Sequence, residues 1–224
     1  MNRLYLVRHG ENRANITKEF SCKKIDYPLT PKGVLQARQT AEYFQDKDIH
    51  EIHSSPLKRA VQTAEIIAAP LGLEVSVTEN FREMNVGELE LRPPSAENWM
   101  LHNRITADWL RGKSEARFPG GEDYETLWQR MRCGIGRIVA GKTGRNVIVV
   151  AHGGLFFCTL KDLCRDVDVA WLREQENHNC SITEVAIDVS DGRLDGKLIT
   201  WASCAHLSGA AAELVPGVPR AHDF

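Results

Sequence analysis

The chain has 224 residues, 42% of them hydrophobic, which is enough for one well-packed core and close to the upper size of a single α/β domain. Its 28 basic and 30 acidic residues leave a net charge of −2, which excludes a global basic field for binding nucleic acid or an anionic membrane. No signal-peptide pattern follows Met1 and no apolar run has membrane-spanning length, so we expect a cytoplasmic protein that binds anions only locally.

Short runs of β-branched and aliphatic residues predict four to six strands. The runs lie near residues 4–7, 49–55, 73–78, 146–151, 181–189 and 198–202. Helical patterns separate most of them. This alternation predicts an α/β fold with a mostly parallel sheet.

Two helices are predicted to begin with the same pair of residue types. Thr30 and Pro31 form an N-cap and first-position pair, and Ser55 and Pro56 repeat it. The spacing of apolar residues supports both helices and a third one over residues 122–139. Their apolar faces contain Val34, Ala37, Ala41 and Phe44; Ala60, Ala64 and Ile67; and Leu127, Met131, Ile135 and Ile138.

The segment 81–121 interrupts the alternation and is predicted to be a lid-like insert within one domain of residues 1–224. It contains a probable helix with Trp99 and Trp109, and it ends in the turn FPGGE. We expect Arg104 or Arg111 to select a substrate with a second anionic group, and ordinary packing of the tryptophans is the alternative. From about residue 202 an Ala-, Gly- and Pro-rich tail is predicted.

Arginine and histidine side chains follow three of the predicted strands. Arg8 and His9 end the first run, Arg59 lies in the first helical turn after 49–55, and His152 follows 146–151. Because the carboxyl ends of parallel strands share one edge, these segments should converge. Guanidinium groups match phosphoryl oxygens, and an imidazole nitrogen can attack phosphorus. Together they predict a phosphoryl site, although each residue alone could be a solvated charge or a structural histidine.

Four motifs resemble the histidine phosphatase superfamily, in the branch of the cofactor-dependent phosphoglycerate mutases and broad-specificity phosphatases. These are RHGENRAN, SSPLKRAVQTA, FREMNVGELE and VVAHGG, and the resemblance covers residues 4 to about 205. It implies a three-layer α/β/α sandwich, as in phosphoglycerate mutases. Relatives often have Gly-Glu-Trp-Glu-Gly where this chain has residues 87–91, Gly-Glu-Leu-Glu-Leu, so the local pocket wall should differ.

The resemblance also implies roles for individual residues. His9 would be the nucleophile that becomes phosphohistidine, Arg8, Arg59 and His152 would surround the phosphoryl group, and Glu83 would be the proton donor. The substrate-binding set would be Asn15, Gly153, Glu11 and Glu122. Glu11 could instead be the donor or position the loop, and the macrodipole could explain Glu122 at a helix start. The His-Asp pair of the acid-phosphatase branch has only a poor counterpart in His222 and Asp223.

The predicted function is a metal-independent phosphatase that hydrolyses a small-molecule phosphomonoester. A mutase with the same residues and a non-catalytic phosphate-binding domain are the alternatives. The six cysteines are scattered and favour free thiols, and neither a metal nor a cofactor is assigned. The expected partner is a small phosphorylated metabolite, not nucleic acid or a membrane. The sequence leaves open the alcohol half of the substrate and the oligomeric state, a homodimer included.

Overall fold

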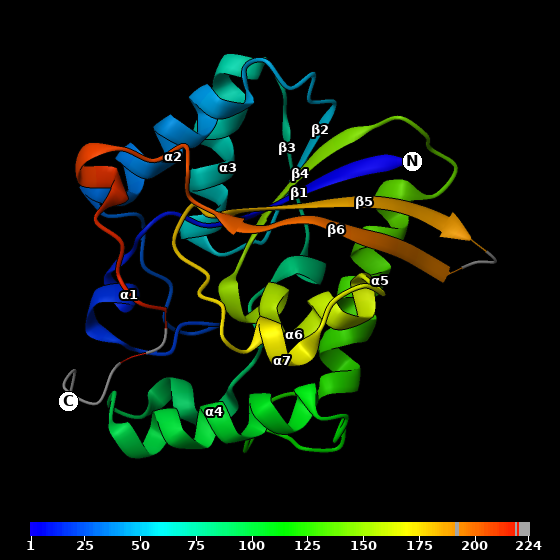
Figure 1. The fold of residues 1–224 in the computed structure, drawn as a ribbon. Helices are drawn as coiled ribbons and strands as arrows, with labels where there is room; N and C mark the ends of the chain where they lie inside the picture. Colours follow the sequence, from blue (N-terminus) through cyan, green and yellow to red (C-terminus); the bar gives the residue numbers. More distant parts are fainter. Residues whose placement is uncertain (191–192, 218, 220–224) are drawn as a thin grey trace.

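The computed structural model describes residues 1–190, 193–217 and 219, and its centre is a six-stranded sheet (Figure 1). The strand order is β3-β2-β4-β1-β5-β6. Strands β1 to β4 run parallel, while β5 pairs antiparallel with β1, and β6 with β5. The mostly parallel sheet is therefore confirmed. The strand bounds are β1 (Asn2–Arg8), β2 (Glu51–Ser54), β3 (Val75–Val77), β4 (Asn146–Ala151), β5 (Ile182–Ser190) and β6 (Arg193–Ser203).

Side chains of β1 alternate between two hydrophobic cores. Leu4 and Leu6 belong to the core formed with α4, α5 and α6, whereas Tyr5 and Val7 belong to the core formed with α2 and α3. A strand buried on both faces must be apolar at every position, which explains the continuous run in the sequence. The three-layer α/β/α architecture is confirmed. The helices are α1 (Arg13–Thr17), α2 (Pro31–Phe44), α3 (Lys58–Leu71), α4 (Ala96–Leu110), α5 (Tyr124–Val139), α6 (Gly153–Leu163) and α7 (Val169–Leu172), with 3-10 turns η1 (Glu79–Phe81), η2 (Gly87–Leu91) and η3 (Gly209–Ala212).

The starts of α2 and α3 differ, although the sequence predicted them to be alike. Thr30 caps α2 as predicted, because its side chain accepts a hydrogen bond from the Gly33 N–H. The prediction for Ser55 and Pro56 is wrong, since α3 begins at Lys58. Ser55 instead prolongs β2, donating its N–H to the Val150 carbonyl at 3.0 Å. An Asp26 carboxylate oxygen from a distant loop accepts the Lys58 N–H at 2.9 Å.

Helix α5 forms where the sequence predicts a helix, and the segment 81–121 contains the helix predicted for it. Asp123 caps α5, which begins at Tyr124, and the predicted apolar stripe of this helix is buried. The insert contains α4, in which Trp109 is buried while Met100 is 70% exposed. The lid role of this segment and the single-domain division remain predictions. None of the described helices is long and apolar enough to cross a membrane.

The predicted C-terminal tail folds back onto α2 where the structure describes it. Strand β6 continues to Ser203, and η3 follows it. The Gln36 side-chain amide donates to the Ala211 carbonyl at 3.1 Å, and Lys32 donates to the Glu213 carbonyl at 3.0 Å. The pair His222 and Asp223 lies outside the described residues.

Helix α2 begins in direct backbone contact with the loop that follows β1. A Cβ atom at Gly33 would lie 2.1 Å from the Glu11 carbonyl oxygen, and one at Gly10 would lie 2.6 Å from the Gly33 oxygen. Real Cβ atoms do not approach this closely. The two glycines therefore set the distance between α2 and the loop that carries His9.

We predict that Gly33→Ala lowers the free energy of unfolding by about 1–3 kcal/mol, because the added methyl group must displace backbone atoms. Urea denaturation measures this change. Gly136→Ala in α5 is the matched control, since no atom lies within 4 Å of its added Cβ and helix propensity favours Ala by about 0.5–1 kcal/mol. Equal stability of the two variants would contradict the proposed close packing.

Candidate active site

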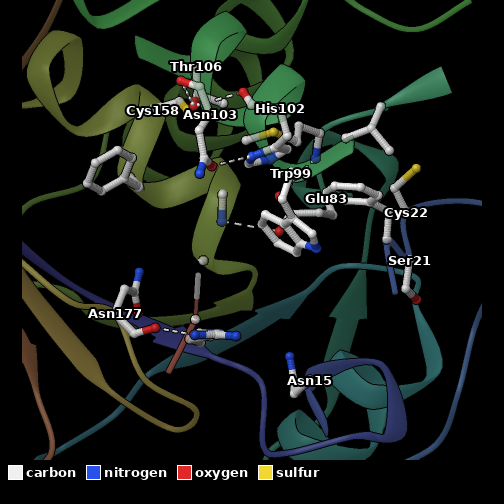
Figure 2. A pocket seen from close by; sticks show the side chains of 18 of the residues that line it. Asn15, Ser21, Cys22, Glu83, Trp99, His102, Asn103, Thr106, Cys158 and Asn177 are labelled. Atoms are coloured by element: carbon white, nitrogen blue, oxygen red, sulfur yellow. Dashed lines mark hydrogen bonds between the residues drawn. The ribbon is translucent and has the colours of Figure 1, made fainter. Parts of the chain in front are cut away.

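The carboxyl ends of the parallel strands bring Arg8, His9 and Arg59 to one pocket of about 570 Å³, and His152 contacts Arg59 without lining the pocket. Arg8 is the last residue of β1 and His9 follows it, Arg59 is the second residue of α3, and His152 links β4 to α6. Arg8, His9, Arg59, Asn15 and Glu83 all line this pocket, and Figure 2 shows the last two. The structure thus brings together segments that are far apart in the sequence.

The hydrogen bonds of His9 fix its tautomer. Its Nδ1 lies 2.7 Å from the Gly10 carbonyl oxygen, and its Nε2 lies 3.0 Å from Nε of Arg59. A carbonyl only accepts and a guanidinium only donates, so the neutral ring carries its proton on Nδ1 and a lone pair on Nε2. Burial, followed by the charges of Arg59 and Arg8, lowers the pKa of His9 well below its ordinary value. His9 is therefore a neutral imidazole whose Nε2 lone pair faces Arg59.

The backbone around His9 is held on several sides. The His9 N–H donates to the Ala151 carbonyl of β4 at 2.9 Å, and the Gly10 N–H donates to the Thr63 hydroxyl at 3.0 Å. The Asn179 side chain donates both to the His9 carbonyl and to Oδ1 of Asn15, each at 3.0 Å. The Asn179 amide therefore couples these two site residues.

Asn15 projects its amide nitrogen toward the interior of the pocket (Figure 2). Its Oδ1 also accepts the Asn12 N–H at 3.0 Å, which completes a capping box at the start of α1. Because the oxygen is engaged on two sides, the side chain cannot flip without losing both bonds. Asn15 is thereby oriented as a hydrogen-bond donor.

Arg59 is the most connected cation of the site. Its Nη1 donates to the Ser21 hydroxyl at 3.0 Å, its Nη2 to the Ser21 carbonyl at 2.7 Å, and the same Nη2 lies 3.2 Å from Nδ1 of His152. Burial lowers the pKa of Arg59 to about 10, while Glu83 and Asp26 oppose that effect. The group is therefore charged at neutral pH. Sequence reasoning missed Ser21, which no motif marks.

Arg8 lies at the wall of the pocket, and one of its donors lacks a partner among the described residues. The side chain is buried, and one terminal nitrogen donates to the Asn177 carbonyl. Its Nε has no hydrogen-bond partner among the residues that the structure describes. Gly153 permits this position, because a Cβ atom there would lie 3.2 Å from that Nε. A buried, unsatisfied guanidinium donor at a pocket wall is suited to an anionic ligand.

His152 is the second neutral imidazole of the site. Its Nε2 lies 2.7 Å from the Ser55 hydroxyl, and its Nδ1 faces the guanidinium of Arg59, which can only donate. The ring therefore carries its proton on Nε2. Burial, followed by the charge of Arg59, lowers the pKa of His152 well below its ordinary value. The ring centroids of His9 and His152 are 5.2 Å apart.

Glu83 is anchored to the first turn of α6. Its Oε1 accepts the N–H groups of Met84 at 2.9 Å and Leu155 at 2.8 Å, and its Oε2 accepts the Gly154 N–H at 3.1 Å. Oε1 is therefore saturated, whereas Oε2 keeps room for one more hydrogen bond. A proton carried by this group would reside on Oε2.

The structure places Glu122 outside the pocket, which corrects its expected contact with substrate. One of its carboxylate oxygens accepts the Asn85 N–H at 2.7 Å and pairs with Nη2 of Arg130 at 2.9 Å. Arg130 also donates to the carbonyls of Asn80, Arg82 and Glu83. We call Glu122 and Arg130 the Glu122–Arg130 clamp, because the pair fixes the backbone that carries Glu83.

Three further expectations are corrected by side-chain positions. Glu11 faces α2, where it pairs with Lys32 at 2.6 Å and accepts from Thr30 at 2.8 Å, so it positions the loop and does not line the pocket. Arg104 and Arg111 are exposed and also lie outside the pocket lining. Arg111 pairs instead with Asp108 of its own helix.

Glu90 anchors the loop that presents Ser21 to Arg59. Its Oε1 accepts four consecutive backbone N–H groups, from Cys22 to Ile25, at 2.7 to 3.1 Å. Burial alone would raise the pKa of Glu90, but these N–H groups lower it. The unusual neighbours Leu89 and Leu91 do not line the pocket. The departure from the relatives' pattern therefore leaves this anchor in place.

The positive charge of the site comes from the two buried guanidiniums of Arg8 and Arg59. Across the described ranges, no group of three His, Cys, Asp or Glu side chains is arranged to hold a metal ion. The arrangement thus combines a nucleophilic imidazole, two cations, an amide donor and a carboxyl group. These groups suit the binding and transfer of a phosphoryl group.

Comparison with known proteins gives one family. The model of the histidine phosphatase superfamily (branch 1) matches residues 4–199. A probable phosphoglycerate mutase GpmB of Yersinia pestis (strain Pestoides F) is 32% identical over 219 residues, covering 95% of this chain and 98% of its own.

Solved structures share the fold. A native mycobacterial glucosyl-3-phosphoglycerate phosphatase has a TM-score of 0.73 at 26% identity, covering 91% of this chain and 99% of its own. A phosphoserine phosphatase from Entamoeba histolytica, solved with 3-phosphoglyceric acid, has a TM-score of 0.74 at 22% identity, covering 93% and 100%. The match along nearly all of the sequence shows that the chain belongs to the histidine phosphatase superfamily, as a phosphatase or a mutase.

Proposed function

We propose that the protein is a metal-independent phosphatase that hydrolyses a small-molecule phosphomonoester through a phosphohistidine at His9. The observation that carries the proposal is the tautomer of His9. Its Nδ1–H is bound to the Gly10 carbonyl, which leaves the Nε2 lone pair beside the guanidinium of Arg59. A neutral imidazole with a fixed lone pair is a nucleophile that needs no separate base.

The first step transfers the phosphoryl group to His9. The group takes hydrogen bonds from Arg8, Arg59 and Asn15, and it replaces His9 as the acceptor for Arg59. Nε2 attacks phosphorus, the bond from phosphorus to the ester oxygen breaks, and Oε2 of Glu83 gives its proton to the departing alcohol. The Gly10 carbonyl stabilises the positive ring through Nδ1–H. One preorganised donor on such a transition state is worth about 10²–10³ in rate.

The second step releases inorganic phosphate. The Glu83 carboxylate takes a proton from water, the water oxygen attacks phosphorus, and the bond from phosphorus to Nε2 breaks. His9 returns to its neutral tautomer, and Glu83 is again protonated. The same carboxyl group therefore acts as acid and then as base.

A mutase is the second candidate, and the relative named probable phosphoglycerate mutase favours it. A mutase would give the phosphoryl group back to a bound substrate and must exclude water from phosphohistidine. The pocket of about 570 Å³ has the size of sites for drug-sized ligands and is roomy for a three-carbon acid. The space for water beside such a substrate supports hydrolysis.

We predict that rapid acid-free quenching during turnover traps a phosphoryl group on His9, stable in base and labile in acid. His9→Ala should abolish both the adduct and phosphate release, because the substitution removes the Nε2 lone pair that attacks phosphorus. His53→Ala, which changes a histidine outside the pocket, is the control and should retain both. Full activity of His9→Ala would overturn the mechanism.

The same assay separates the two candidates. Phosphate release is measured over a panel of phosphomonoesters, and isomerisation of 3-phosphoglycerate is measured in parallel. For a phosphatase, the rate of isomerisation should be lower than the rate of phosphate release. Activity should survive treatment with a chelator, since arginines supply the positive charge. Isomerisation without phosphate release would favour the mutase, and loss of activity restored by zinc or magnesium would contradict metal independence.

We predict that Glu83→Gln slows phosphohistidine formation from an alkyl phosphate by roughly 10²–10⁴, because the amide carries no acidic proton. An aryl phosphate with a much better leaving group should lose less, since its oxygen needs less protonation. Single-turnover kinetics follow this step without the later attack of water. Equal losses for the two esters would show that Glu83 is not the donor.

We predict that Arg130→Met lowers kcat by roughly tenfold to a hundredfold while changing KM little, because the clamp positions Glu83 without touching substrate. The loss should again be smaller for the better leaving group, which a purely structural defect would not produce. Arg132→Met, at an exposed position of the same helix, is the matched control. A loss independent of the leaving group would contradict the role of the clamp.

A further inference from the structure

The pocket extends beyond the arginines to a wall formed by one face of α4. The side chains that α4 contributes are all uncharged. Figure 2 shows Trp99, His102 and Asn103 projecting from this helix on the side opposite to Asn15. The contributing residues are Trp99, His102, Asn103, Thr106, Ala107 and Leu110.

Three of the lining rings form one aromatic cluster at this wall. The centroids of Phe20 and Trp99 are 4.5 Å apart, those of Trp99 and His102 are 5.0 Å apart, and those of Phe20 and His102 are 5.3 Å apart. The Trp99 indole is fixed, because its N–H donates to the Lys18 carbonyl at 2.9 Å. A preformed group of rings offers faces and edges to another flat ring.

Polar groups at this wall are neutral and directional. Burial lowers the pKa of His102 to about 4, so its ring carries no charge at neutral pH. Its Nδ1 lies 3.0 Å from Oδ1 of Asn103. With that oxygen engaged, Asn103 has an amide nitrogen left to donate to a ligand. The wall therefore matches an uncharged group that carries a hydrogen-bond acceptor.

The remaining cations of the pocket, Lys18 and Arg173, are not on α4. Lys18 donates its ammonium group to the Pro216 carbonyl at 2.8 Å. Arg173 is an exposed lining residue, and the acidic Glu174 and Glu176 line the same part of the chain. A second anionic group on the substrate would meet no matching charge along α4 and would lose hydration there.

We propose that the alcohol half of the substrate carries a flat, uncharged ring with a hydrogen-bond acceptor, bound against Phe20, Trp99 and His102 and recognised by Asn103. The inference rests on the proposed function for the phosphoryl end of the pocket. It differs from the sequence expectation, in which arginines of the insert selected a second anion. The selecting helix is the predicted one, but the selecting side chains are aromatic and neutral.

Binding of non-hydrolysable phosphonates tests this proposal without requiring turnover. The aryl series is phenyl-, benzyl- and 2-phenylethylphosphonate, and the anionic series is 2-carboxyethyl- and 3-carboxypropylphosphonate. Calorimetry on the full chain should give the tightest aryl ligand a Kd at least roughly tenfold below that of the tightest carboxylate. Equal or tighter binding of the carboxylates would overturn the proposal.

Variants separate the ring site from the phosphoryl site. Trp99→Leu should remove most of the aryl advantage while leaving the Kd of inorganic phosphate unchanged, and Trp171→Leu, at an exposed position outside the pocket, should change neither. Asn103→Ala, at an exposed position, should weaken 2-(pyridinyl)ethylphosphonates but not 2-phenylethylphosphonate. An unchanged aryl advantage in Trp99→Leu, or carboxylate binding that Arg173→Gln abolishes, would overturn the assignment.

These outcomes are distinguishable from failure of the proposed function. If the aryl series binds tightly but phosphohistidine never forms, the ring site stands and the catalytic proposal fails. If phosphohistidine forms and the carboxylates bind better, the phosphatase proposal stands and the ring site fails.

Discussion

The burial of two guanidinium groups beside a neutral imidazole is the constraint on which the site depends. Removing charged groups from water is costly unless their donors are satisfied. Carbonyls of Ser21 and Asn177, each on a loop, meet part of this need. Glu90 holds one of these loops through four backbone N–H groups. Much of the irregular chain around the sheet edge thus excludes water from the two guanidinium groups and orients them.

The sequence predicts those parts of the fold whose cause is local. The apolar run before Arg8 is buried on both faces of the sheet, and the Thr30–Pro31 pair caps α2 through its own side chain. Convergence of Arg8, Arg59 and His152 follows from the rule that parallel strands end at one edge. Each of these inferences needs only the periodicity of a segment or the identity of its first residues.

Features that depend on distant partners escaped prediction. Ser55–Pro56 resembles Thr30–Pro31, yet the Ser55 hydroxyl is engaged by His152, 97 residues away, and an Asp26 carboxylate caps the helix instead. The resemblance to the family implied a substrate-binding role for Glu122, but its carboxylate pairs with Arg130. A local sequence pattern does not predict which of several possible hydrogen-bond or ion-pair partners a side chain will contact.

In the proposed mechanism, proton transfer and substrate selection depend on different helices. The carboxyl group of Glu83 is held by backbone N–H groups in the first turn of α6, and His152 is the N-cap of that helix, whereas the aromatic wall belongs mainly to α4. Substitutions on the face of α4 that lines the pocket can therefore remodel the wall while the catalytic geometry stays unchanged. Because of this separation, substitutions in a single helix can change the substrate specificity during evolution while every intermediate variant keeps its catalytic activity.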